Sequence, residues 1–87
     1  MKKTNYTPAN RYSDLSVGET VRITRELQGL TQAELAKRAG LSQPILSAIE
    51  NDRLSLGVER AKRLALALLV HPAVLLFANW DVQKKSA

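Results

Sequence analysis

The chain has 87 residues and a formal net charge of +5, from 13 lysines and arginines against eight aspartates and glutamates. This length predicts one small domain, whose core is limited enough to favour self-association. The absence of cysteine and the single histidine exclude a disulfide framework and metal sites built from these residues.

Further absences narrow the class of protein. The sequence contains no nucleophile–base pair and no glycine-rich phosphate loop, so we expect neither an enzyme nor a bound cofactor or metal. No apolar run reaches the length of a membrane span, and the N-terminus lacks the apolar segment of a secretory signal, which predicts a cytoplasmic protein. The basic charge is typical of DNA-binding domains, but also of proteins that are merely soluble and basic.

The start of the chain, residues 1 to 13, is polar and basic and shows no helical periodicity. We interpret it as a flexible arm, which is either a disordered start or a segment that follows phosphates or reaches a minor groove. Residues 14 to 80 are expected to form the folded domain, and residues 81 to 87 a polar tail.

The first predicted helix begins at a capping box, since Ser16 and Glu19 have the required spacing. Residues suited to a core then recur at helical spacing up to Gly29, so the helix is expected over residues 16 to 28. The core face of this helix consists of Val17, Val21, Thr24 and either Leu27 or Gln28.

Two short helices separated by a tight turn are predicted in the middle of the chain. Thr31 and Glu34 form a second capping box, and Gly40 lies where a left-handed C-terminal cap is needed. Ser42 and Pro44 are typical of the cap and the first turn of the next helix. Two helices joined in this way form a helix-turn-helix. They are expected over residues 32 to 39 and 43 to 51.

Two further helices complete the predicted fold. The fourth begins near Gly57, with Ser55 or Gly57 as its cap, and ends before Pro72, because proline disfavours helix in the preceding residue. Pro72 then opens a fifth helix that reaches residue 79. The expected fold is therefore all-α, a compact five-helix bundle with a central helix-turn-helix. The core stripe of the fourth helix is Val58, Ala61, Leu64, Ala65 and Leu68.

A set of residues spread over the segment 17 to 78 carries a family pattern. Its members are Arg25, Gly29-Leu30-Thr31-Gln32, Glu34-Leu35-Ala36, Gly40-Leu41-Ser42, Leu46, Ile49-Glu50-Asn51, Arg53, Leu64-Ala65 and Leu68. In their combined spacing the chain resembles the Xre type of helix-turn-helix, the family of the lambdoid phage repressors and Cro. The resemblance implies a lambda-repressor-like fold and binding to double-stranded DNA.

The resemblance also implies structural roles for residues near the DNA. Arg25 matches a family arginine that pairs with the glutamate matched by Glu50, and this ion pair ties the first helix to the end of the third. Gln32 matches a glutamine that touches the phosphate backbone and steadies the recognition helix. Asp52 stands where the family often has glycine, and aspartate tolerates the left-handed region better than most residues.

The candidate DNA-binding residues are Gln32, Ser42, Gln43, Pro44, Ile45, Ser47, Asn51 and Arg53. Gln43 can form a bidentate pair with adenine in the major groove. Ile45 is expected to be exposed, for contact with a thymine methyl group or with a dimer partner, or by chance. Ser42 either caps a helix only or also binds a phosphate. The family positions matched by Asn51 and Arg53 grip the DNA backbone beyond the groove.

A dimer surface is predicted from apolar residues that so small a core cannot hide. Leu66 and Leu69 stand where the family commonly has lysine and glycine, and the last helix adds further apolar side chains. The interface residues are expected to be Leu66, Leu69, Leu76, Phe77 and Trp80. A two-fold dimer would read a palindromic operator whose half-sites lie about one helical turn apart.

The functional hypothesis is a sequence-specific, dimeric repressor of its own promoter, acting near the bacterial or phage nucleoid. Three roles remain open within it: the antitoxin of a type II toxin–antitoxin pair resembling HigA and HipB, which would bring a toxin as partner, a phage-type repressor, and a restriction–modification controller. The alternative is a protein-interaction module that keeps the fold without reading DNA.

Overall fold

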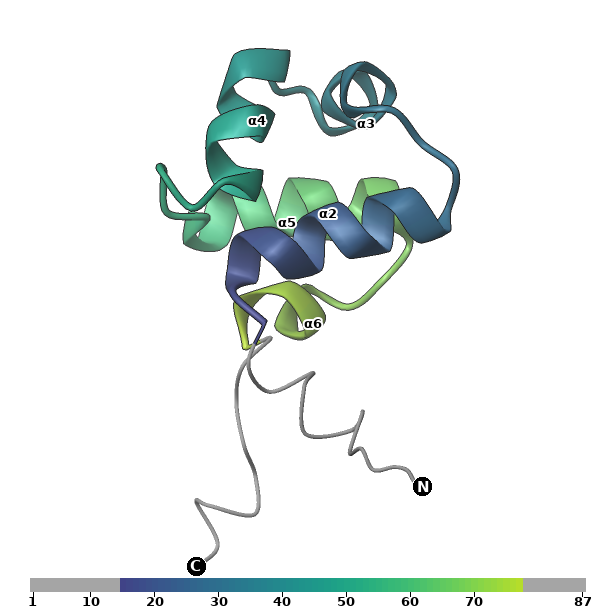
Figure 1. Cartoon of the computed structure of the whole chain (residues 1–87). Coiled ribbons are helices and arrows are strands. Elements are labelled where there is room, and N and C mark those ends of the chain that lie inside the picture. The colour runs from purple at the N-terminus through teal and green to yellow at the C-terminus, as the bar shows by residue number, and fades with distance from the viewer. Residues whose placement is uncertain (1–14, 78–87) are drawn as a thin grey trace, which may run out of the picture.

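The computed structural model describes residues 15 to 77, which form five helices and no strand (Figure 1). The predicted all-helical bundle with a central helix-turn-helix is confirmed. The expected N-terminal arm, C-terminal tail and Trp80 lie outside the described residues. The helices are α2 (Val17–Leu27), α3 (Gln32–Ala39), α4 (Gln43–Glu50), α5 (Gly57–Leu68) and α6 (Pro72–Leu76).

The helices start and stop where local chemistry requires. Both capping boxes form: the Ser16 hydroxyl accepts the Glu19 amide at 3.0 Å, and the Thr31 hydroxyl accepts the Glu34 amide at 3.0 Å. The Thr31 amide donates in return to the Glu34 carboxylate, and this hydrogen bond lowers the pKa of Glu34. The capping box of α3 therefore stabilises the folded state above the ordinary pKa of glutamate. This contribution is lost as the pH falls through the lowered pKa of Glu34. Gly40 closes α3 in the left-handed region, with φ of 71°.

Several boundaries differ from the sequence prediction, and for α2 the predicted end residues Ser16 and Gln28 are its caps. Helix α4 ends at Glu50, and Asn51 is its C-cap. The expected cap of α5 at Ser55 or Gly57 is wrong, because Leu56 occupies the N-cap position and no side chain bonds to the first turn. Helix α6 ends at Leu76, before the predicted residue 79, with Phe77 as C-cap, while His71 caps its start by accepting the Ala73 amide.

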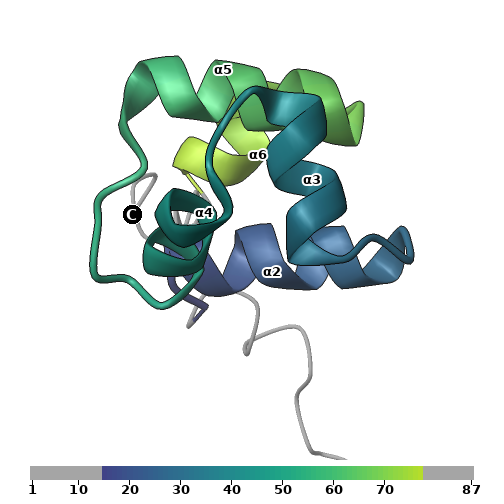
Figure 2. The ribbon, with the colours of Figure 1, turned by 90° about the horizontal axis from the view of Figure 1, so that it is seen from above.

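The core lies between two groups of helices. Helices α3 and α4 cover one side of the layer formed by α2 and α5, and α6 covers the other (Figures 1 and 2). Two predictions about the core are wrong. Neither Leu27 nor Gln28 is buried, and Leu27 is 83% exposed; Val58 is 59% exposed. Leu27 and Val58 each lie at a helix end. The largest fully buried side chains are Leu35, Leu46, Ile49, Leu64, Leu68, Leu75 and Val21.

Candidate nucleic-acid interface

The first half of α4 presents a polar surface without charge. Ser42, Gln43 and Pro44 are exposed at the end of the helix farthest from α6 (Figure 1). The Ser42 hydroxyl accepts the Ile45 amide at 3.3 Å, and Pro44 lies in the first turn, where its missing amide proton costs nothing. A surface without acidic groups can approach a polyanion without repulsion.

The side chains of Leu46 and Ile49, farther along α4, pack into the core. Leu46 and Ile49 are fully buried in the core, and Ser47 is half-buried. The expectation that Ile45 is exposed is wrong, because its side chain is half-buried and packs against the core cluster. Only part of Ile45 therefore remains for a contact with a base.

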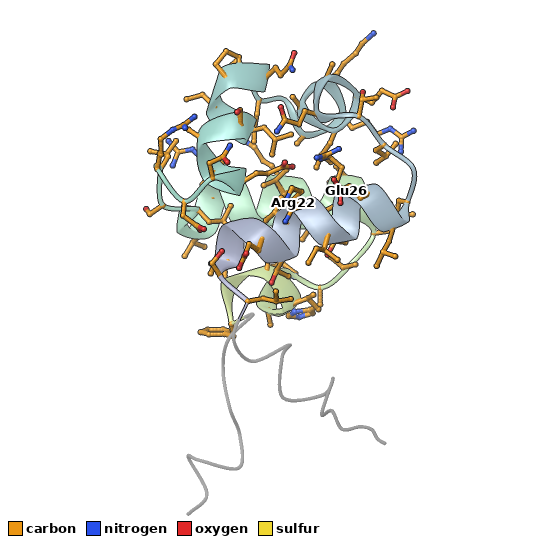
Figure 3. All side chains as sticks on the ribbon, in the orientation of Figure 1. Arg22 and Glu26 are labelled. Carbon is orange, nitrogen blue, oxygen red and sulfur yellow. The ribbon has the colours of Figure 1, made fainter. Side chains whose placement is uncertain are left out.

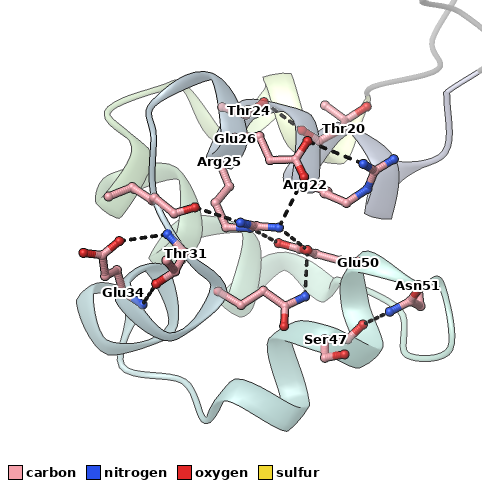
Figure 4. Close-up of polar contacts among 12 residues, drawn as sticks. Thr20, Arg22, Thr24, Arg25, Glu26, Thr31, Glu34, Ser47, Glu50 and Asn51 are labelled. Carbon is pink, nitrogen blue, oxygen red and sulfur yellow. Dashed lines mark hydrogen bonds and ion pairs between the residues drawn. The ribbon is translucent and has the colours of Figure 1, made fainter.

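The helix-turn-helix is held to α2 by a buried ion pair. The Arg25 guanidinium donates to both oxygens of Glu50, at 2.7 Å from Nε and 3.1 Å from Nη2, and to the Leu30 carbonyl at 2.7 Å (Figure 4). The side chains of Arg25 and Glu50 are only 10% and 1% exposed. The hydrogen bond to Glu50 raises the pKa of Arg25, so the guanidinium stays charged at neutral pH.

Gln32 joins this network from the start of α3. Its side-chain amide donates to Glu50 Oε1 at 2.9 Å, and the residue is half-buried. The structure thus brings Gln32 together with Arg25 and Glu50. The sequence prediction gave Gln32 a phosphate contact; the observed hydrogen bond uses one of its two amide hydrogens and leaves the other for such a contact.

The turn after α4 carries the two remaining candidates. Asn51 and Arg53 are both exposed. The Asn51 side chain donates to the Ser47 carbonyl at 2.8 Å, which fixes its orientation along α4 (Figure 4). Arg53 forms no ion pair with any residue in the described range of 15 to 77. Its positive charge is therefore available to a phosphate.

Arg22 and Arg63, unlike Arg53, each have an acidic partner on their own helix. Arg22 and Glu26 face each other one turn apart on α2, at 3.5 Å (Figure 3), and Arg63 lies 3.8 Å from Glu59 on α5. Such exposed pairs contribute little to stability. In each pair the carboxylate neutralises a positive charge of the kind that Arg53 keeps available.

The predicted dimer residues fall into three groups. Leu66, Leu69 and Phe77 are exposed, by 77%, 86% and 58%. Leu76 is half-buried and packs against the core, so only part of its side chain remains for an interface. Trp80 lies outside the described residues. Leu27 is exposed as well, although its helical spacing placed either this residue or Gln28 on the core face.

Leu27 and Leu69 lie beside a hydrogen bond that joins the ends of α2 and α5. The side-chain amide of Gln28 donates to the Leu68 carbonyl at 2.7 Å. This bond joins the C-terminal end of α2 to that of α5. The exposed leucines 27 and 69 are each next in sequence to one of its partners, so the two helix ends present apolar groups in one region of the surface.

Two negative findings apply to the part of the chain that the structure describes. No helix between residues 15 and 77 is long and apolar enough to cross a membrane. The same residues contain no group of three or more histidine, cysteine, aspartate or glutamate side chains placed to hold a metal ion.

Comparison with known proteins identifies the family. Residues 21 to 75 match the helix-turn-helix family of the Xre and lambda-repressor type, and the chain belongs to this family of DNA-binding transcription regulators. The crystal structure of a hypothetical transcription factor, NHTF, from Neisseria is similar over 97% of both chains, with 25% sequence identity and a TM-score of 0.69. A search of curated proteins gave no match.

The buried ion pair generates a stability prediction. Replacing Glu50 with glutamine leaves the largely buried Arg25 charge with Glu26, 3.9 Å away and half-exposed, as its remaining counter-ion, so we expect a loss of about 3 kcal/mol in the free energy of unfolding. Replacing Arg22 with alanine, which breaks the exposed pair with Glu26, is the matched control and is expected to cost less than about 1 kcal/mol. Urea unfolding followed by circular dichroism measures both. Equal losses would contradict a structural role for the buried pair.

Proposed function

We propose that the chain is a sequence-specific regulator that binds double-stranded DNA with α4 in the major groove and represses its own promoter as a dimer. The observation that carries this proposal is the division of α4 between two tasks. Its buried C-terminal half holds the helix in the bundle, while Ser42, Gln43 and Pro44 at the other end are exposed and uncharged.

Affinity and discrimination come from different residues in this proposal. Arg53, Asn51 and Gln32 contact phosphates, which supply affinity through the release of counterions and make binding fall with salt. Gln43 forms a bidentate pair with an adenine, and Ser47 reaches a base or a phosphate beside it. A contact of this kind discriminates against a wrong base by about 1–3 kcal/mol.

The family and the similarity to NHTF, described as a hypothetical transcription factor, support a regulator over an enzyme. We infer that the protein has no catalytic activity and acts in the cytoplasm, where its DNA lies. The three roles of antitoxin, phage-type repressor and restriction–modification controller share this DNA-binding chemistry. A toxin that co-purifies at a fixed ratio would distinguish the first of them.

The proposal is tested by fluorescence anisotropy with duplex DNA from upstream of the protein's own coding sequence. Replacing Gln43 with alanine is expected to weaken binding to this duplex about tenfold or more, since one bidentate contact is lost. Binding to a scrambled duplex of the same length and composition should change little, because its contacts are to phosphates.

The matched control for this experiment is Arg53→Gln, which should weaken binding to both duplexes and reduce the salt dependence by about one phosphate contact. Equal binding of native and scrambled duplexes by the unmodified protein would contradict sequence reading. Partner binding with no DNA affinity to lose would favour the protein-interaction module.

The proposed dimer surface is supported by a strained leucine. Leu69 ends α5 with φ of 60°, in the left-handed region that costs a residue with a Cβ roughly 1–2 kcal/mol, and its side chain is 86% exposed. A glycine would remove both the strain and the exposed apolar surface. An interface that buries Leu69 together with Leu66 explains why a leucine is used here.

The dimer is tested with Leu69→Gly, read by sedimentation velocity and thermal unfolding. Relief of backbone strain should preserve or raise the melting temperature at concentrations where the protein is monomeric, while the dimer dissociation constant rises about tenfold or more, the loss expected for a well-packed interface residue. Val58→Ala, at another exposed apolar position, is the control and should leave the dissociation constant unchanged. A monomer at all concentrations would contradict the proposed dimer.

A further inference from the structure

The turn that leaves α4 is fastened to the start of α2 by one side chain. Asp52 Oδ2 accepts the Ser16 hydroxyl at 2.6 Å, and Oδ1 accepts the Gly18 amide at 3.0 Å. Both carboxylate oxygens therefore face α2. The two contacts cross 36 and 34 positions in sequence, so they determine where the turn lies relative to the rest of the bundle.

The backbone of this turn sets the position of Arg53. Asp52 has φ of 61°, and its amide donates to the Ile49 carbonyl at 3.0 Å, while the Arg53 amide donates to the Ala48 carbonyl at 2.8 Å. This pair of bonds is the Schellman motif, which ends a helix through one residue in the left-handed region. Arg53 is the residue that directly follows, so its direction depends on Asp52 keeping this conformation.

Gly18 on α2 allows the start of α2 and the end of α4 to approach closely. A Cβ atom on Gly18 would lie 2.2 Å from the Ile49 carbonyl oxygen and 2.8 Å from that of Glu50. The amino end of α2 thus abuts the carboxyl end of α4, and the opposite partial charges of the two helix ends attract. Asp52 adds a carboxylate at the amino end of α2, where a negative charge is favourable.

The negative charge of Asp52 is unfavourable for DNA binding, so its place in this turn needs another explanation. An exposed carboxylate between Asn51 and Arg53, the two proposed phosphate ligands, repels DNA. Glycine would adopt the same backbone conformation without strain and without charge. We propose that Asp52 is the positioning residue for the phosphate contact of Arg53, and that its bonds to Ser16 and Gly18 outweigh its repulsion of the DNA. This inference rests on the proposed DNA-binding function.

The test is the effect of Asp52→Gly on DNA affinity, measured by anisotropy at several salt concentrations. We expect binding about fivefold to tenfold weaker despite the loss of a negative charge, with the salt dependence reduced by about one phosphate contact. Asp52→Asn is the conservative variant: its amide oxygen can accept from Gly18 and its amide nitrogen can donate to the Ser16 hydroxyl oxygen. It should restore affinity to within about twofold of the unmodified protein.

A double-mutant cycle with Arg53→Gln separates positioning from a general loss of structure. When Arg53 is already absent, Asp52→Gly should weaken DNA binding no further. Circular dichroism at the assay temperature confirms that each variant is folded. If Asp52→Gly unfolds, Ser16→Ala takes its place in the cycle; it removes one of the two bonds to Asp52 together with the hydroxyl that caps α2, and the cycle with Arg53→Gln separates the two effects.

Three outcomes would overturn the inference. Tighter or unchanged binding by Asp52→Gly would show a carboxylate that only repels DNA. An equal loss with and without Arg53 would show a structural role alone, and an Asp52→Asn variant as weak as Asp52→Gly would exclude the hydrogen bonds as the cause. Because phosphate contacts do not depend on sequence, the cycle can be read on a scrambled duplex even if sequence reading itself fails.

Discussion

The ion pair between Arg25 and Glu50 determines how three helices are arranged. Burying two charges is unfavourable unless their hydrogen bonds are satisfied and their geometry is good. Here the guanidinium donates to both oxygens of Glu50 and to the Leu30 carbonyl, and Gln32 donates to Glu50 as well. The Glu50 carboxylate thus connects α2, α3 and α4, and the Arg25 guanidinium adds the α2–α3 turn. Any shift of α4 would leave part of this network buried and unpaired.

A second connection between α2 and α4 lies about two turns away along α2. Asp52 bonds to Ser16 and Gly18 at the start of α2, while Arg25 is near its end. The end of α4 is therefore attached to α2 at two separate points, and a single attachment would allow α4 to rotate relative to α2. The C-terminal half of α4 therefore holds the helix in place, and the exposed N-terminal residues need no structural role beyond capping.

Local chemistry made most of the fold predictable. Capping boxes at Ser16 and Thr31 and the left-handed Gly40 each depend on residues within one turn, so sequence spacing was sufficient to find them. Exposure was harder to predict, because periodicity gives a face of a helix but not where its neighbours end. Leu27 and Val58 have core spacing, yet both lie at helix ends and are exposed.

In the candidate site, too, local features could be predicted from the sequence, whereas contacts that depend on packing could not. The exposure of Gln43 and the cap at Ser42 follow from their positions in α4. The hydrogen bond from Gln32 to Glu50 joins residues 18 positions apart. The hydrogen bonds that Asp52 accepts from Gly18 and Ser16 span 34 and 36 positions. Such contacts depend on how the helices pack, and one sequence does not contain that information outside a family resemblance.

The most direct test of this account is a titration of isotope-labelled protein with its upstream duplex, followed through backbone amide chemical shifts. We expect the shift changes to concentrate at the start of α3, at residues 42 to 47 and at residues 51 to 53. Helix α6 should change little, because it lies away from the exposed end of α4 (Figure 1). Changes centred on α5 and α6, with residues 42 to 47 unaffected, would contradict the assignment of α4 as the helix that reads DNA.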